Sequence, residues 1–114
     1  MSEAALATVE AVVARGGDAD DVLRAVVAAL HDAGYAWAGI LFVEDGALSL
    51  GPDAGTPGTA GRTTVPVVWV GEPVAELAVE GATPEDAPFL ARVAELVAGH
   101  CLVGWDTGGE AWNP

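Results

Sequence analysis

The feature that most constrains the fold is an apolar segment, residues 35–44, followed at once by an Asp-Gly pair. Successive side chains of a strand point to opposite faces, and here both sets are apolar. One face carries Trp37, Leu41 and Val43, and the other carries Ala38, Ile40 and Phe42. A strand that is apolar on both faces belongs in the interior of a sheet.

Two hairpins are predicted. Asp45 and Gly46 form a favoured pair for a two-residue type I′ turn, which leads into a second strand over residues 47–50. Residues 65–70 and 73–80 form the other hairpin, and the leading glycine of the Gly-Glu pair between them fits a type II′ turn. In its last strand the acidic residues share one face and the apolar residues the other, so the second face of the sheet is only partly apolar.

Three helices are predicted from apolar residues that recur at helical spacing. They cover residues 2–14, residues 20–33, and a third segment that opens at residues 83–86 with a Thr-Pro-Glu-Asp start and ends at Gly99. Residues 51–61, GPDAGTPGTAG, have no periodicity, and we interpret them as a connector that crosses the end of the sheet. The elements together predict an α+β fold.

Length and charge limit the possible functions. A chain of 114 residues is one domain, with residues 1–17 as an N-terminal helix and turn and residues 101–114 as a tail rich in Trp and Gly. Seventeen acidic residues against four arginines give a net charge of −13, which repels phosphate backbones and anionic lipid. We therefore expect no nucleic acid and no membrane as partners. No apolar run reaches the ~18 consecutive residues that a membrane span requires.

A cytoplasmic location is expected. The first residues carry Glu3 and Glu10 where a secretory signal needs a positively charged start. The one cysteine, Cys101, cannot form an internal disulfide, and this fits a reducing compartment.

Candidate chemistry is scarce in this sequence. His100 and Cys101 are neighbours, so on a helix end their side chains point in different directions. His31 lies far from His100 along the chain, and neither has ligand spacing around it, which argues against a metal. Residues 51–61 lack the lysine and the following helix of a phosphate-binding loop. We expect no catalytic residue, no metal and no cofactor.

The order helix, helix, hairpin, hairpin, helix resembles the GAF domain, a sensing and signalling fold built on a central antiparallel sheet. Residues 37–58, WAGILFVEDGALSLGPDAGTPG, resemble the first hairpin of the free methionine-R-sulfoxide reductase branch of that family. Residues 65–97, which begin VPVVWVGEPV, resemble its closing half. The resemblance implies a four-stranded antiparallel sheet in the order 2-1-4-3 with three helices on one face. Chain order alone would also allow a 1-2-3-4 meander.

The departure from that branch concerns its chemistry. In the reductases, a long segment between the two halves carries cysteines and helices that roof the ligand pocket, and here only residues 51–61 separate the halves. The reductase cycle oxidises one thiol and resolves it with a second, so Cys101 alone cannot complete it. We therefore expect a non-enzymatic sensory or regulatory module that acts through a small ligand or a protein partner. The alternatives are a degenerate reductase and a purely structural homodimerisation unit.

A ligand, if one binds, is expected between the second face of the sheet and residues 51–61. The candidate contact residues are Trp37, Arg62, Trp69, Glu76, Glu80 and, in the tail, Trp105 and Trp112. The two carboxylates favour a neutral or cationic ligand, with Arg62 as the one counter-charge nearby. The partly apolar uncovered face also predicts a homodimer, which salt would strengthen by screening the like charges.

Overall fold

The sheet of this protein has the strand order β2-β1-β4-β3, and every neighbouring pair is antiparallel. The computed structural model describes residues 3–58 and 61–102. The strands are β1 (Trp37–Glu44), β2 (Ala47–Gly55), β3 (Arg62–Trp69) and β4 (Glu72–Glu80). This order confirms the predicted arrangement and excludes the meander. The apolar strand β1 is an interior strand, as its two apolar faces require.

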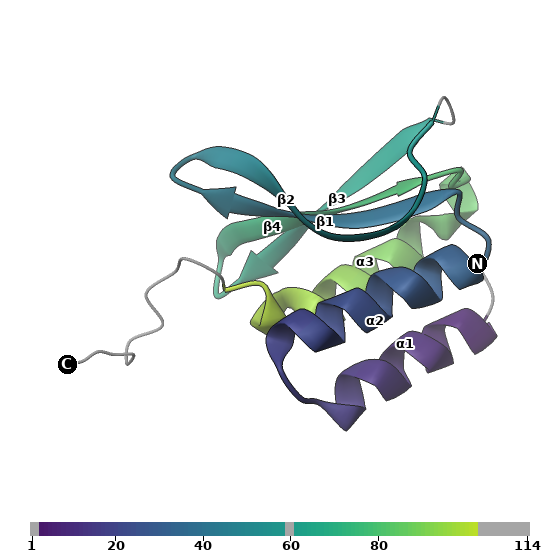
Figure 1. Cartoon of the computed structure of the whole chain (residues 1–114), viewed down its shortest axis with the longest axis horizontal. Helices are drawn as coiled ribbons and strands as arrows, with labels where there is room; N and C mark the ends of the chain where they lie inside the picture. The colour runs from purple at the N-terminus through teal and green to yellow at the C-terminus, as the bar shows by residue number, and fades with distance from the viewer. Residues whose placement is uncertain (1–2, 59–60, 103–114) are drawn as a thin grey trace.

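All three helices lie on one side of the sheet (Figure 1). They are α1 (Glu3–Arg15), α2 (Ala19–Asp32) and α3 (Ala87–Val97), with short 3₁₀ turns at Pro84–Asp86 and Ala98–His100. Helices α2 and α3 contact the strands, whereas α1 packs on α2 and α3. Among the described residues, no helix is long and apolar enough to cross a membrane.

The core fills the space between the sheet and the helices. Ile40 of β1 is paired with Leu77 of β4, and both are fully buried on the side of the helices. The apolar stripes of the helices meet them there, with Val26, Leu30, Leu90 and Val93 fully or almost fully buried. The predicted division of β1 into two faces is confirmed.

Strand β2 is longer than the sequence predicts. The prediction ended it at Leu50, but the strand continues to Gly55, so the connector to β3 is residues 56–61. The pairing with β1 shifts register between Gly39 and Leu41, which accommodates the Gly-Pro pair that breaks the apolar pattern. The Phe42 ring lies where a side chain of Gly51 would be, 2.3 Å from an added Cβ, so glycine is required there.

The β3–β4 turn is also different from the prediction. Val70 and Gly71 form it, with φ angles of +49° and +81°, and Trp69 is paired with Glu72. Positive φ at both central residues is the type I′ pattern, so the predicted Gly-Glu type II′ turn was wrong. A β-branched residue such as Val70 rarely adopts a positive φ. The sequence therefore favoured a turn one residue later, at Gly71 and Glu72. The Asp45-Gly46 turn has φ angles of +53° and +79°, as expected for type I′.

Candidate functional site

The side of the sheet that no helix covers, here called the open face, carries four of the predicted contact residues. Trp37 of β1 is paired with Glu80 of β4, which is paired with Arg62 of β3, so these three side chains form one row across the sheet. Glu76 lies on the same face, opposite Leu41. The register therefore brings Trp37, Arg62 and Glu80 together at one end of the open face.

Trp37 is held flat against the sheet and is only 2% exposed. Its ring lies over Gly39, where an added Cβ would be 2.5 Å from the ring atom Cζ2. The indole N–H donates a hydrogen bond to Oδ2 of Asp53 at 2.9 Å. The guanidinium carbon of Arg62 lies 4.3 Å from the ring centroid, a cation–π arrangement. The ring is therefore enclosed between its own strand and Arg62.

Glu80 ties this arrangement to the connector between β2 and β3. The side chain is buried, and Oε1 accepts a hydrogen bond from the Gly58 backbone N–H at 2.8 Å. Oε2 accepts a hydrogen bond from Nη2 of Arg62 at 3.0 Å. The hydrogen bond from the Gly58 N–H, and to a smaller extent the one from Arg62, hold the pKa of Glu80 below its usual value. Arg62 is thus already paired with a carboxylate, which opposes its use as a counter-charge for a phosphate.

We call Trp37, Asp53, Arg62 and Glu80 the tryptophan cluster. Sequence reasoning missed two of the groups involved, namely Asp53 and the Gly58 backbone N–H that contacts Glu80. Both lie in the segment interpreted as a connector, and their contacts depend on the extension of β2 and on the register of β1. The cluster fills its end of the open face with the side chains of the protein itself.

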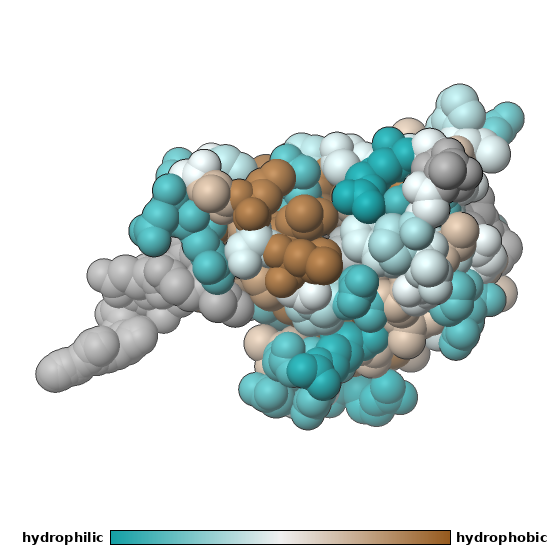
Figure 2. All heavy atoms as spheres, turned by 45° about the horizontal axis from the view of Figure 1, so that its top comes forward, coloured by the Kyte–Doolittle hydropathy of each residue, from teal (hydrophilic) through white to brown (hydrophobic). Residues whose placement is uncertain are grey.

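The other end of the open face is apolar and exposed. We call Leu41, Val43, Leu48, Leu50 and Val68 the apolar patch. Leu48 and Leu50 are paired with Val43 and Leu41 across β1 and β2, and they are 49% and 57% exposed. Val68 of β3 is 47% exposed. In Figure 2, strongly hydrophobic atoms gather over this part of the sheet, with hydrophilic atoms on both sides of them.

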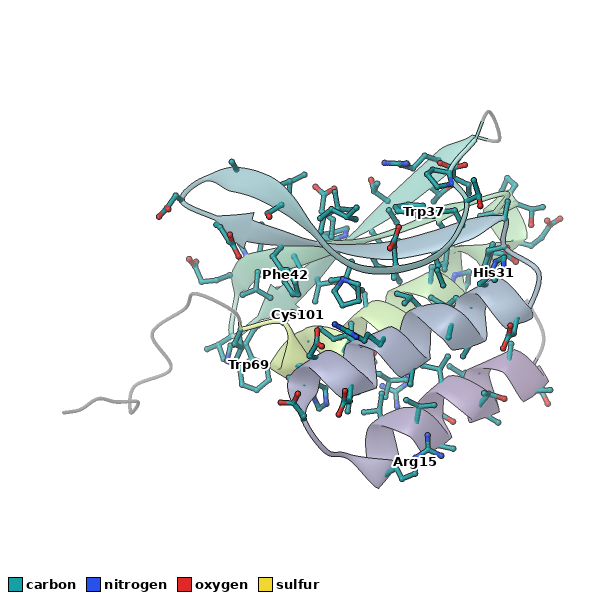
Figure 3. The ribbon with its side chains drawn as sticks, in the orientation of Figure 1. Arg15, His31, Trp37, Phe42, Trp69 and Cys101 are labelled. Atoms are coloured by element: carbon teal, nitrogen blue, oxygen red, sulfur yellow. The ribbon has the colours of Figure 1, made fainter. Side chains whose placement is uncertain are left out.

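Trp69 is not part of either group. Its ring packs against Gly99, where an added Cβ would lie 3.2 Å from the ring, so it lies on the side of the helices. Figure 3 shows Trp37 and Trp69 at opposite ends of the sheet. The two rings therefore do not lie side by side. Trp105 and Trp112 lie outside the described residues.

Cys101 is fully buried beyond the end of α3. Burial raises the pKa of its thiol to about 12, so the group is protonated at neutral pH. A thiol in this state is a poor nucleophile. Among the described residues, no three His, Cys, Asp or Glu side chains are grouped to hold a metal ion.

A second buried polar contact joins the start of the sheet to the start of α3. The Tyr35 hydroxyl donates to Oδ2 of Asp86 at 2.8 Å, and both residues are buried. Burial, and to a smaller extent the hydrogen bond to Asp86, raise the pKa of Tyr35. The Asp86 carboxylate also accepts the Thr83 backbone N–H at 3.4 Å, within a capping box. Because both residues are buried, we assign this contact a structural role.

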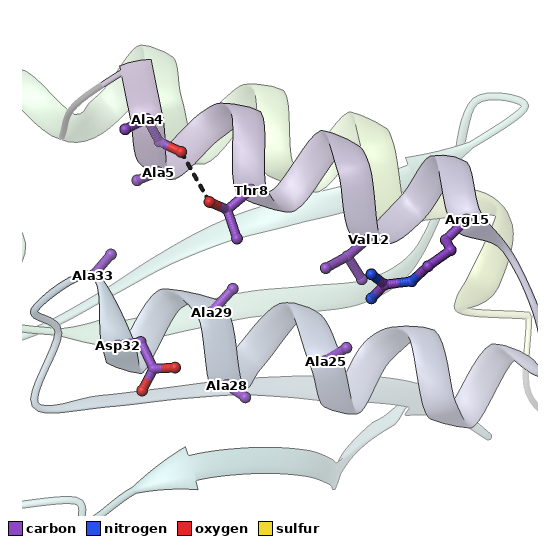
Figure 4. A pocket seen from close by; sticks show the side chains of 10 residues that line it. All are labelled: Ala4, Ala5, Thr8, Val12, Arg15, Ala25, Ala28, Ala29, Asp32 and Ala33. Carbon is purple, nitrogen blue, oxygen red and sulfur yellow. Dashed lines mark hydrogen bonds between the residues drawn. The ribbon is translucent and has the colours of Figure 1, made fainter.

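A shallow groove of about 540 Å³ lies between α1 and α2, on the side of the molecule away from the sheet (Figure 4). Alanines of the two helices line most of it, with Arg15 and Asp32 as its charged residues. The Thr8 hydroxyl donates to the Ala4 carbonyl at 3.0 Å and is thereby satisfied within α1. The groove offers no arrangement of groups for binding or chemistry.

Two solved structures are similar to this chain. One is a type II free methionine-R-sulfoxide reductase from Thermoplasma acidophilum, with a TM-score of 0.65 and 18% identity over 79% of this chain and 94% of that one. The other is the GAF domain of a phosphoenolpyruvate-protein phosphotransferase from Acinetobacter, with a TM-score of 0.70 and 15% identity over 89% and 94%. No protein-family model and no curated protein matches the sequence. The chain therefore has the GAF-like fold that its sequence resembles, and at these identities the likeness concerns the fold alone.

The Glu80 contacts predict a pH dependence of stability. A carboxylate whose pKa is lower in the folded state stabilises that state above its unfolded pKa, about 4.3, and this contribution disappears as the pH falls through the folded value. At pH 7 the variant Glu80→Gln should therefore unfold at a lower urea concentration than the parent. The difference should shrink steadily below about pH 4.

The control for this measurement is Glu44→Gln, which removes one exposed carboxylate at the end of β1 and corrects for the relief of general charge repulsion. A difference between the parent and Glu80→Gln that is the same at pH 7 and at pH 3, after this correction, would contradict the role given to the carboxylate.

Proposed function

We propose that this chain is a non-enzymatic GAF-like regulatory module that binds a protein partner on the apolar patch of its open face. The observation that carries the proposal is the division of that face. One end is filled by the tryptophan cluster, and the other end exposes Leu48, Leu50 and Val68. Contiguous exposed apolar surface on a sheet is a mark of an interaction site.

A small-ligand pocket receives less support from the same face. Only residues 56–61 connect β2 to β3, a segment too short to form helices over the sheet. The ring of Trp37, the predicted aromatic platform, is buried beneath Arg62. A ligand would have to separate Arg62 from both Glu80 and the ring before it reached the platform.

Both edge strands of the sheet contain a proline, which makes the face of the sheet a better binding surface than its edges. The edge strand β2 contains Pro52 and the edge strand β3 contains Pro66. Proline has no backbone N–H and interrupts the row of donors that an added strand needs. Strand addition is therefore unfavourable at both edges, which supports docking on the open face.

The runner-up is a reductase of the kind found in the similar structure. The buried, protonated Cys101 argues against it, and we expect no reduction of free methionine sulfoxide by dithiothreitol above the protein-free background. The thiol should also stay unreactive toward Ellman's reagent until the protein is unfolded. If the purified protein turns over methionine sulfoxide and a folded Cys101→Ala variant does not, the reductase hypothesis would be favoured instead.

Site-specific photo-crosslinking in the cells that make the protein tests the proposal. A photoreactive amino acid replaces Leu50 of the patch or, as the control, Ala28, which is exposed on α2. We expect a discrete adduct with a different protein from position 50 and none from position 28. Equal labelling from both positions, or none from position 50, would contradict the proposal. An adduct of two copies of this chain would instead favour the structural homodimer.

A further inference from the structure

The charges around the apolar patch indicate the chemistry of its partner, an inference that rests on the proposed function. We infer that the patch binds an amphipathic helix whose apolar stripe is flanked by lysine or arginine residues. Three observations carry it: the position of the acidic residues beside the patch, the positions of the arginines, and the shape of the surface.

Acidic side chains border the patch. Glu76 lies on the open face directly opposite Leu41, and it is partly exposed. Asp45 stands exposed in the turn between β1 and β2, beside the Val43–Leu48 pair. Among the described residues, no ion pair joins either of these two carboxylates to a basic side chain.

The four arginines of the chain lie elsewhere. Arg24 pairs with Asp20 on α2, and Arg92 pairs with residues of α1 and α3. Arg15 lines the groove between α1 and α2 on the far side of the molecule. Arg62 is on the open face, but Glu80 in the tryptophan cluster neutralises it. The patch is therefore an apolar surface with uncompensated negative charge at its border, and a partner with basic flanks complements it.

A helix fits this surface better than a strand does. The opposite face of the same sheet already packs against two helices, α2 and α3, which is the usual way for a sheet to bury an apolar face. The prolines in β2 and β3 oppose strand addition at the edges. An amphipathic helix presents an apolar stripe, with room for basic residues on both sides of it.

A second copy of this chain is a poorer occupant. A two-fold interface on the patch brings each surface against itself, so Glu76 and Asp45 of one copy would approach the same acidic border of the other. That contact would strengthen as salt screens the repulsion, whereas binding of a basic helix weakens with salt. The direction of the salt dependence separates the two occupants.

The test uses a labelled synthetic peptide of about five helical turns, with a leucine stripe flanked by lysines. Binding is followed by fluorescence anisotropy at about 0.05 M and about 0.5 M salt. One comparison peptide replaces the leucines by serine and keeps the charge, and another replaces the lysines by glutamate. We expect the leucine-lysine peptide to bind several-fold more tightly than either, and more weakly at the higher salt.

Protein variants locate the binding. Leu50→Ser should weaken it about tenfold, and Glu76→Gln should weaken it about threefold at low salt with little effect at high salt. The matched controls are Val70→Ser, an exposed apolar residue at the β3–β4 turn, and Asp21→Asn, an exposed acid on α2. Both controls should bind like the parent, and the circular dichroism spectrum of each variant confirms folding.

Equal binding of the serine-lysine peptide would overturn the inference, because attraction to the overall charge of −13 would then explain it. Equal loss in the controls, or equal binding of the glutamate peptide, would overturn it as well. So would a mass that doubles as salt rises, which identifies a second copy. If no peptide binds but position 50 still forms crosslinks with another protein, the basic helix is wrong and the proposed function stands. If position 50 forms none, the proposed function itself fails.

Discussion

The placement of all three helices on one side of the sheet is the constraint on which the rest of this structure depends. Strand β1 is apolar on both faces, so its second face needs cover that no helix supplies. At the start of β1 the cover is Trp37, which folds back over Gly39 and is closed above by Arg62. Glu80 fixes Arg62 and, through the Gly58 N–H, the connector beside it. This end of the open face is thereby occupied by side chains of the protein itself.

Because the tryptophan cluster occupies one end of the open face, the exposed apolar surface lies at the other end. There the side chains of β1 and β2 project outward in apolar pairs, Leu41 with Leu50 and Val43 with Leu48, and nothing in the described part of the chain covers them. The thiol of Cys101 is buried beyond the end of α3, and burial raises its pKa to about 12. The GAF-like fold of this chain thus combines a tryptophan cluster at one end of the open face with an exposed apolar patch at the other, and the proposed protein-binding role rests on that division.

Much of the fold could be predicted from the sequence, because two-faced apolarity placed β1 inside and the acidic residues of β4 marked the uncovered side. The alternation of β3 also places Trp69 with Val65 and Val67 on the side of the helices, a signal that sequence reasoning left unused. Other features depend on register, which a single sequence does not reveal. The pairing of Arg62 with Glu80 and the bond from Trp37 to Asp53 need the bulge beside Gly39 and the continuation of β2 through a Gly-Pro pair. Val70 adopts a left-handed turn conformation that valine disfavours, so residue preferences predicted the turn at the wrong position.

The central claim, that Trp37 closes its end of the open face from within, is tested most directly by the stability of Gly39→Ala. Alanine normally stabilises a strand relative to glycine, but here the new methyl group meets a buried ring that Asp53 and Arg62 hold in place. Urea unfolding should show a loss of about 1–3 kcal/mol, while Gly61→Ala, where nothing lies within 4 Å, should change little. A Gly39→Ala variant as stable as the parent, or more stable, would mean that the ring does not lie over Gly39, and it would contradict the account.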